Sequence, residues 1–167
     1  MSGGGFSGPL YGAVVDVLKA AATAGSIGSG AMALDPLKVF EAAVPQSGGQ
    51  LPLAVVRLPL QPYDSNKWVA SGNFKDSLFK VEVALQCNVT LDGSVAHPYG
   101  DGTTPGILTL SDDVMNALET AGSTFKAATA KLIDFSVGAA AMQPDAAGTA
   151  TTIFTITFQV RYVAGNR

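Results

Sequence analysis

The sequence has few of the side chains that bind metals or act as nucleophiles. Among 167 residues it contains one cysteine, Cys87, and one histidine, His97. A single cysteine excludes an internal disulfide, and a lone histidine without nearby ligands or a triad partner argues against a zinc site or a hydrolase centre. Because Cys87 falls on the apolar side of an alternating run, we expect it to be a buried small hydrophobic residue.

Charge is also scarce, and there is no excess of positive charge. Asp, Glu, Lys and Arg make up 14% of the sequence, against about 25% in an average soluble domain. The formal net charge of -3 provides no basic field for a nucleic-acid backbone. Since 47% of the residues are hydrophobic, we expect either a surface that is largely buried against partners or a surface of Gly, Ala, Ser and Thr.

Long hydrophobic runs are missing as well. No apolar stretch approaches the roughly 18 to 20 residues that a membrane-spanning helix requires. Residues 1–5 lack the basic region with which a signal peptide begins. We therefore expect a protein that has no membrane partner and is not exported by a signal peptide.

What the sequence does contain is two long alternating patterns, over residues 78–91 and 151–163. In both, apolar residues alternate with polar ones, which predicts strands with one apolar and one polar face. At about 3.3 Å per residue such strands extend some 40 Å, about twice the usual length. Because the polar faces hold mostly Thr, Gln and Asn, we expect them to meet another subunit.

Apolar residues at helical spacing predict two helices. The first spans about residues 9–24, with Ser7 as its N-cap and Gly25 closing it. The second spans residues 112–121, with Ser111 as its N-cap, an acidic first turn and a glycine at its end.

Shorter elements and loops fill the remainder of the chain. Residues 37–44 and 53–60 are apolar runs next to prolines, which indicates strands at sheet edges. Residues 131–142 predict a strand that forms a hairpin with the C-terminal strand, because a strong turn sequence separates them. Two long loops are expected at 61–76 and 92–106.

Together these patterns predict an α+β fold with a mainly antiparallel sheet. Two long strands dominate this sheet, which packs against two helices and carries long loops. Residues 9–167 form a single domain, and residues 1–8 form a flexible glycine-rich arm. Phe6 is the one bulky residue of this arm, so it either packs on its own domain or anchors a neighbouring subunit.

Four aspartates are the best candidates for chemistry. Asp92 and Asp101 each precede a glycine in a turn sequence, whereas Asp112 and Asp113 lie where a helix start favours negative charge. These structural roles account for all four carboxylates, so we expect no catalytic residue, no metal and no cofactor. A cation held by Asp92 and Asp101 is the alternative, which calorimetric titration with calcium would reveal.

The order of the elements resembles a known family. The helix start Leu110-Ser111-Asp112-Asp113-Val114 and the final strand TIFTITFQVRY, residues 152–162, contribute to the resemblance. Together with the N-terminal helix, the edge strands and the long central strand, they resemble the tail terminator or tail completion proteins of long-tailed bacteriophages. The resemblance covers roughly residues 9–163 and rests on order and pattern.

The resemblance implies a structural virion protein of the tail neck region, present in the host cytoplasm during assembly, and not an enzyme. Such proteins form a hexameric ring that caps the tail tube, stops its growth and joins the tail to the head connector. Its implied partners are further copies of itself, the tail tube protein and the head-tail connector protein, with the tail sheath as a further candidate. Contact with the genome passing through the ring would be transient and unspecific.

This chain differs from that family in its low charge, its glycine-rich arm and its two extended loops. We therefore expect the arm and loops to carry the contacts with other subunits and with the tube. Phe6, Trp68 and Tyr99 are the expected aromatic anchors, since aromatic residues are enriched at interfaces. The full set of candidate contact residues is Phe6, Lys67, Trp68, Asn73, His97, Tyr99 and Asp101.

Two alternatives remain at this point. A tail tube or head-tail adaptor protein would also assemble as rings through extended sheets and loops, but purified tube protein would form long tubes. A small ligand-binding or hydrolytic α+β domain would instead show a convergent polar pocket near Asp92 to Asp113.

Overall fold

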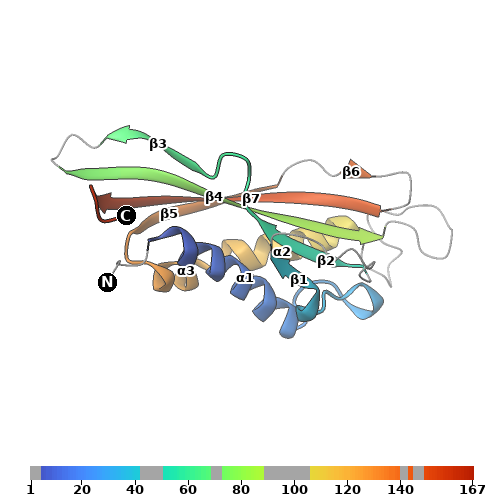
Figure 1. The fold of residues 1–167 in the computed structure, drawn as a ribbon. Helices are drawn as coiled ribbons and strands as arrows, with labels where there is room; N and C mark the ends of the chain where they lie inside the picture. The colour runs from blue at the N-terminus through green and yellow to red at the C-terminus, as the bar shows by residue number, and fades with distance from the viewer. Residues whose placement is uncertain (1–4, 42–50, 69–72, 89–105, 140–142, 145–148) are drawn as a thin grey trace.

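Strands β4, Phe74–Asn88, and β7, Thr149–Val163, form the frame of the structure. The computed structural model describes residues 5–41, 51–68, 73–88, 106–139, 143–144 and 149–167. The two strands have 15 residues each and pair antiparallel along their full length, from Phe74 opposite Val163 to Asn88 opposite Thr149 (Figure 1). The predicted pair of long strands is confirmed.

Shorter strands extend this pair on both sides. The sheet order is β1-β2-β4-β7-β5, while β3 pairs with β4 and β6 pairs with β7. Only the β1–β2 pairing is parallel, so the sheet is mainly antiparallel, as predicted. The added strands are β1 (Val39–Glu41), β2 (Leu53–Arg57), β3 (Tyr63–Trp68), β5 (Leu132–Ala139) and β6 (Gln143–Pro144).

The α-helices lie together on one face of the sheet and leave its other face uncovered by helix (Figure 1). They are α1 (Ser7–Thr23), α2 (Ile107–Glu119) and α3 (Gly122–Ala128), and two short 3₁₀ turns, Gly30–Met32 and Pro36–Lys38, follow α1. The fold is therefore α+β in two layers, one of helices and one of strands.

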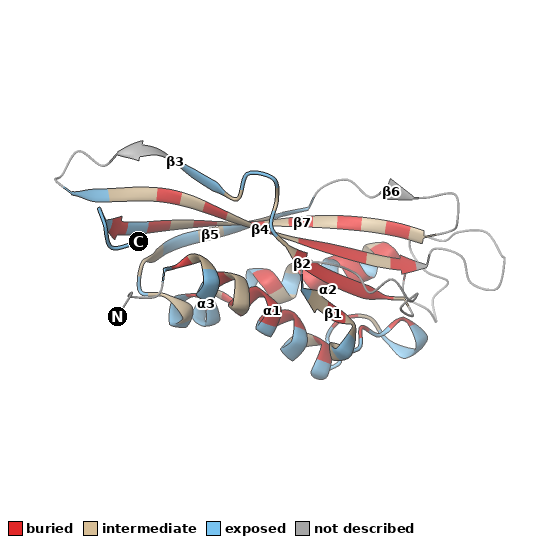
Figure 2. Cartoon of the chain, viewed as in Figure 1, coloured by how far each residue is buried: buried red, intermediate tan, exposed pale blue. Residues whose placement is uncertain are grey.

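The core lies between these two layers. In β7 every second side chain from Ala150 to Tyr162 is buried, which matches the period of a strand with one face against helices (Figure 2). From α1, Leu10, Val14 and Leu18 are buried at the i, i+4 and i+8 positions of a single helical stripe. The buried residues of β7 and the buried stripe of α1 thus belong to one hydrophobic core.

The second helix begins earlier than the sequence suggests. It starts at Ile107, after Gly106, so Ser111 lies inside α2 and is not its N-cap. Ile107 and Leu110 are fully buried, and their burial favours the additional turn. The Ser111 Oγ donates a hydrogen bond to Thr152 Oγ1 at 3.0 Å in the buried helix–sheet interface. Ser111, the predicted N-cap, therefore connects α2 to β7 through a buried hydrogen bond.

Two further expectations need correction. Residues 61–76 were expected to form a loop, but β3 occupies Tyr63–Trp68 and β4 already begins at Phe74. Strand β3 lacks an apolar alternation because it lies at a sheet edge, and its register with β4 shifts between Asp64 and Lys67. The short helix α3 follows α2 directly, beginning at the glycine that was expected to end the helical region.

The start of α1 changes the expected N-terminal arm. Ser7 is the first residue of α1 and not its N-cap, so the arm cannot extend to residue 8. Phe6 is buried, with 1% of its surface exposed, and its ring packs against Phe79 and Tyr162. Phe6 therefore packs on its own domain, the first of the two alternatives for this residue, and is not an exposed side chain of a flexible arm. The prediction that Gly25 closes α1 is confirmed by its φ of 70° and the hydrogen bond from its N–H to Ala22 O.

Candidate assembly surface

No described helix covers the face of the sheet opposite α1, α2 and α3 (Figure 2), although at its β2 end Leu53, Val55 and Ala84 are buried in a second, smaller apolar cluster. Lys80 and Glu82 of β4, with Thr155, Thr157 and Gln159 of β7, lie side by side on this face, and all are partly exposed. Short polar side chains can be covered by another protein at lower desolvation cost than unpaired charges. This composition suits a surface that is covered on assembly.

Two ion pairs neutralise most of the charge at this face. The Arg57 Nε lies 3.1 Å from Glu82 Oε2, joining β2 to β4. Arg161 donates from Nε to Asp76 Oδ1 at 2.7 Å and from Nη2 to Asp76 Oδ2 at 2.9 Å, a bidentate pair. The hydrogen bonds to Asp76 raise the pKa of Arg161 above its ordinary value. Both pairs are partly exposed, so solvent screens them and each contributes little to the stability of the fold.

A groove runs along this face beside the β2–β3 linker. It has a volume of about 840 Å³ and is open to solvent. Leu58 and Leu60 of the linker are 50% and 104% exposed, although apolar side chains of this size are usually buried. The groove therefore combines polar sheet residues with unburied leucines. Its lining consists of Arg57, Leu58, Pro59, Leu60, Gln61, Lys80, Glu82 and Thr155.

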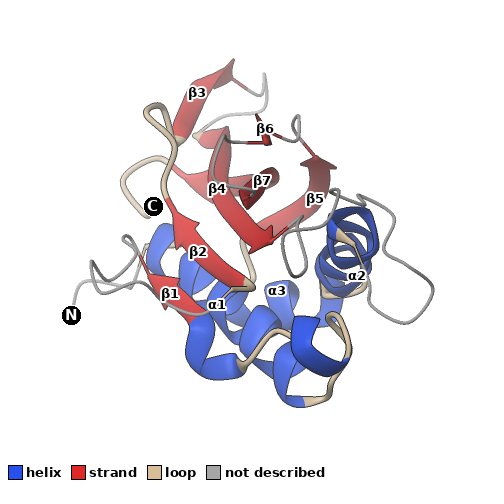
Figure 3. Cartoon of the chain, turned by 90° about the vertical axis from the view of Figure 1, so that its right-hand side faces the viewer, coloured by secondary structure: helices blue, strands red, loops and turns tan. Residues whose placement is uncertain are grey.

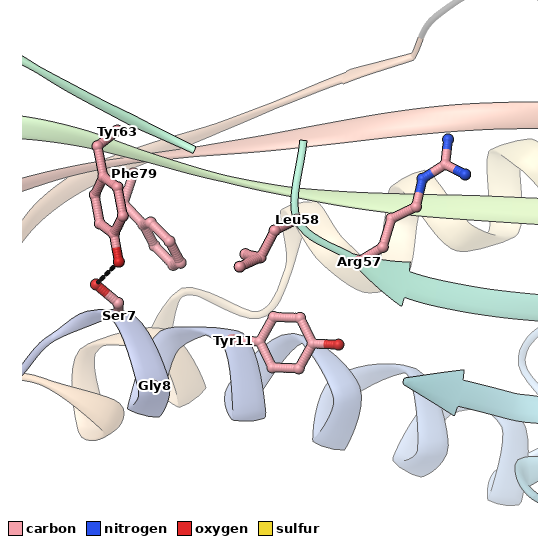
Figure 4. A pocket seen from close by; sticks show the side chains of 7 residues that line it. All are labelled: Ser7, Gly8, Tyr11, Arg57, Leu58, Tyr63 and Phe79. Atoms are coloured by element: carbon pink, nitrogen blue, oxygen red, sulfur yellow. Dashed lines mark hydrogen bonds between the residues drawn. The ribbon is translucent and has the colours of Figure 1, made fainter. Parts of the chain in front are cut away.

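A second cleft, of about 560 Å³, lies on the helix side of the same linker (Figure 4). Here the Tyr63 hydroxyl donates to Ser7 Oγ at 3.0 Å, and the Tyr11 hydroxyl donates to Val56 O at 2.7 Å. The one charged residue in its lining, Arg57, points its guanidinium away from the tyrosines. The described residues that line the cleft are mainly apolar and aromatic, and they do not include the convergent polar groups of a catalytic pocket.

Strand β5 forms the edge of the sheet opposite β1 and β3 (Figure 3). Its eight residues include one charged side chain, Asp134, and Ile133 is 41% exposed. Edge strands usually avoid further pairing through lysine, proline or a bulge. Here only a register shift between Leu132 and Asp134 interrupts the ladder with β7. This edge is a second candidate contact surface that the sequence analysis did not identify.

The described residues offer little chemistry. Among them, no group of three His, Cys, Asp or Glu side chains is placed to hold a metal ion. Burial raises the pKa of the Cys87 thiol to about 12, so the thiol is neutral at pH 7, and its predicted burial is confirmed. Asp113 accepts a hydrogen bond from the Gly28 N–H at 3.0 Å, which gives it a structural role. No helix in the described ranges is long and apolar enough to cross a membrane.

The predicted contact residues fall into three groups. Lys67 and Trp68 lie in β3, with backbones opposite Asp76 and Lys75, which places them at the same end of the sheet as Asn73. The Asn73 carbonyl accepts a hydrogen bond from Ala164 N at 2.8 Å. Phe6 is in the core. His97, Tyr99 and Asp101 lie outside the described residues, as do Asp92 and most of the loop expected at 92–106.

No protein-family model and no curated protein matches the sequence. The function must therefore be inferred from the chain's own residues and fold.

Proposed function

We propose that this chain is a structural virion protein, a phage tail terminator. In this proposal, copies of the chain form a ring, with a hexamer as the expected number, that caps the tail tube and stops its polymerisation. The ring then joins the tail to the head connector. Its partners are further copies of itself, the tail tube protein and the head-tail connector protein, with the tail sheath as a further candidate. The protein is located in the tail neck, and its contact with the genome is transient and unspecific.

The observation that carries the proposal is the uncovered face of the β4–β7 pair. Fifteen residues of each strand pair without interruption, and helices cover only one side of them. A domain of 167 residues has no need of strands this long for its core, since typical strands have about 5 to 6 residues. A face that is mostly polar along β4 and β7, carries two ion pairs and is edged by exposed leucines supports burial against another subunit.

The two edges of the sheet offer surfaces through which neighbouring copies can contact each other in a ring. Strand β5 ends the sheet on one side, and β1 and β3 end it on the other. A contact between unlike edges of neighbouring copies is heterologous, and such contacts generate a closed ring when the rotation between copies closes. The low density of charge at β5 lowers the electrostatic cost of bringing copies together. The fold thus has the two different surfaces that a ring requires.

The decisive experiment is electron microscopy of particles produced when this gene is interrupted in its source phage or prophage. We expect overlong tails of variable length, separated from filled heads, because nothing would cap the tube or join it to the connector. Missing tubes would instead assign the protein to the tube or its initiation, and tubes of normal length lacking heads would assign it to a head-tail adaptor. Normal particles would contradict every virion role.

Leu60→Asp tests the linker surface directly. The Leu60 side chain is fully exposed in the single chain, so the substitution should leave the free energy of unfolding within about 0.5 kcal/mol of the parent. If Leu60 becomes buried between copies, the buried charge should weaken ring formation at least 10-fold. Analytical ultracentrifugation measures the assembly.

The matched control is Leu37→Asp. Leu37 is also strongly exposed, at 82%, but lies in the 3₁₀ turn before β1 and outside the groove. We expect it to assemble like the parent protein. Equal loss of rings in both variants would mean that the groove does not by itself control assembly, because Leu37 lies outside the groove and next to β1.

A further inference from the structure

Three aromatic rings surround the guanidinium of Arg167. Its Cζ lies 4.7 Å from the centroid of the Tyr63 ring, 5.3 Å from that of Phe6 and 5.8 Å from that of Tyr162. All three distances fall within the roughly 6 Å range of a cation–π interaction. We call Phe6, Tyr63 and Tyr162 the aromatic cage. It joins residues from the start of α1, from β3 and from the end of β7.

The cage is held in place by contacts that do not involve Arg167. The Phe6 ring lies 5.7 Å from Tyr162 and 6.1 Å from Phe79, and the Tyr63 ring lies 5.4 Å from Phe79. With Arg167 in place Phe6 and Tyr162 are 1% and 7% exposed, and their ring contacts with each other and with Phe79 hold them. Tyr63 is also fixed by its hydrogen bond to Ser7 Oγ. Removing Arg167 should therefore leave a preformed site.

Arg167 reaches the cage on an exposed turn with few attachments. Ala164 N donates to Asn73 O, Asn166 N donates to Val163 O, and Gly165 adopts a φ of +84°. Residues 163–167 are all exposed. Among the described residues no carboxylate lies within ion-pair distance of Arg167. The aromatic faces are thus the partners of this cation, and its turn can leave the cage without disturbing the core.

One residue of the cage also lines a cleft, whereas Phe6 and Tyr162 are not among the residues that line it. Tyr63, the most exposed member of the cage at 45%, lines the 560 Å³ cleft together with Ser7, Gly8 and Tyr11 (Figure 4). A planar guanidinium stacks on aromatic faces better than an ammonium does, because it is more weakly hydrated. The site therefore favours arginine over lysine.

We propose that the aromatic cage is a binding site for an arginine guanidinium, which Arg167 fills within its own chain, and that it accepts Arg167 of a second copy on assembly. The second copy is the favoured source because its turn offers the cage the same contacts, so exchange between copies has a low cost. This rests on the proposed ring, for which it names one contact between subunits. In the ring, each copy would contribute both an arginine and a cage.

The binding site is tested with Arg167→Ala and a peptide of the sequence YVAGNR, residues 162–167. NMR titration should show saturable shifts of the Tyr63 and Tyr162 rings. The same peptide with citrulline, which is neutral and nearly isosteric, should bind about 3- to 30-fold more weakly. The parent protein should bind the arginine peptide at least 10-fold more weakly than Arg167→Ala, because its own Arg167 competes.

The control variants separate the ring of Tyr63 from its hydroxyl. Combined with Arg167→Ala, Tyr63→Phe keeps the aromatic face and should retain binding, whereas Tyr63→Leu removes it and should lose binding. Folding of each variant is checked by circular dichroism. Absence of peptide binding to folded Arg167→Ala, or equal binding of the citrulline peptide, would overturn the site.

Mixing two variants tests the second copy as the source. Arg167→Ala retains a cage but lacks the arginine, and Tyr63→Leu retains the arginine but lacks the complete cage. At high concentration the mixture should assemble more strongly than either variant alone, into oligomers that contain both variants, measured by native mass spectrometry. If peptide binds but mixing does not strengthen assembly, the assignment to a second copy is wrong. Electron microscopy of particles from the interrupted gene tests the ring proposal independently of this result.

Discussion

Phe158→Ala should lower the free energy of unfolding by about 3 to 5 kcal/mol. The Phe158 side chain is fully buried, and its ring lies 5.0 Å from Phe125, 6.3 Å from Phe79 and 6.4 Å from Phe135. These neighbours come from α3, β4 and β5. Because three elements meet at this ring, they cannot all collapse into the cavity that its removal leaves. Urea denaturation followed by circular dichroism measures the loss.

Phe74→Ala is the matched control for this prediction. Phe74 begins β4, opposite Val163, and is 44% exposed. Its removal creates no enclosed cavity, so we expect a loss of no more than about 1 kcal/mol. Similar losses for Phe158→Ala and Phe74→Ala would show that the aromatic cluster is not the centre of the core.

The two long strands could be predicted because their environment is uniform along their length. In β7 each position alternates between the helix layer and the uncovered face, so its sequence has an unbroken period of two. Strand β3 was missed for the opposite reason. Its residues, YDSNKW, pair at an edge with a shifted register and carry no such period. Pairing partners distant in sequence determine that strand, and local pattern does not reveal them.

Side-chain burial was harder to predict than the elements themselves. Phe6 follows glycines, which suggested an arm, yet the aromatic rings of Phe79 and Tyr162 bury it. Leu58 and Leu60 were read as part of a strand over 53–60, but β2 ends at Arg57 and leaves them exposed. The groove beside them depends on where one strand ends. That endpoint is set by tertiary pairing with β4, which covers only residues 53–57.

The structural roles of the aspartates were also hard to predict from the sequence. Asp112 and Asp113 were expected in the first turn of a helix, but α2 begins at Ile107 and places them a turn later. Asp113 instead accepts a hydrogen bond from Gly28 N, 85 residues away in sequence. This contact joins α2 to the turn after α1. The glycine-rich stretch of residues 25–30 is therefore fixed to the core, and Ile27 within it is fully buried.

Gly28→Ala should therefore cost about 2 to 4 kcal/mol of stability. Gly28 has a φ of +70°, and a Cβ at this position would lie 2.1 Å from Met32 O and 2.9 Å from Met32 C. Both are backbone atoms of a 3₁₀ turn, so relieving the clash must move the turn or withdraw the Gly28 N–H from Asp113.

Gly30→Ala separates this clash from the cost of the backbone conformation alone. Gly30 has a φ of +58°, but a Cβ there would meet no atom within 4 Å. It should cost only about 1 kcal/mol, the conformational penalty by itself. Thermal and urea denaturation of both variants give the comparison. Equal losses would mean that the turn adjusts to Gly28→Ala without strain against Met32 and without losing the Asp113 hydrogen bond that joins it to α2.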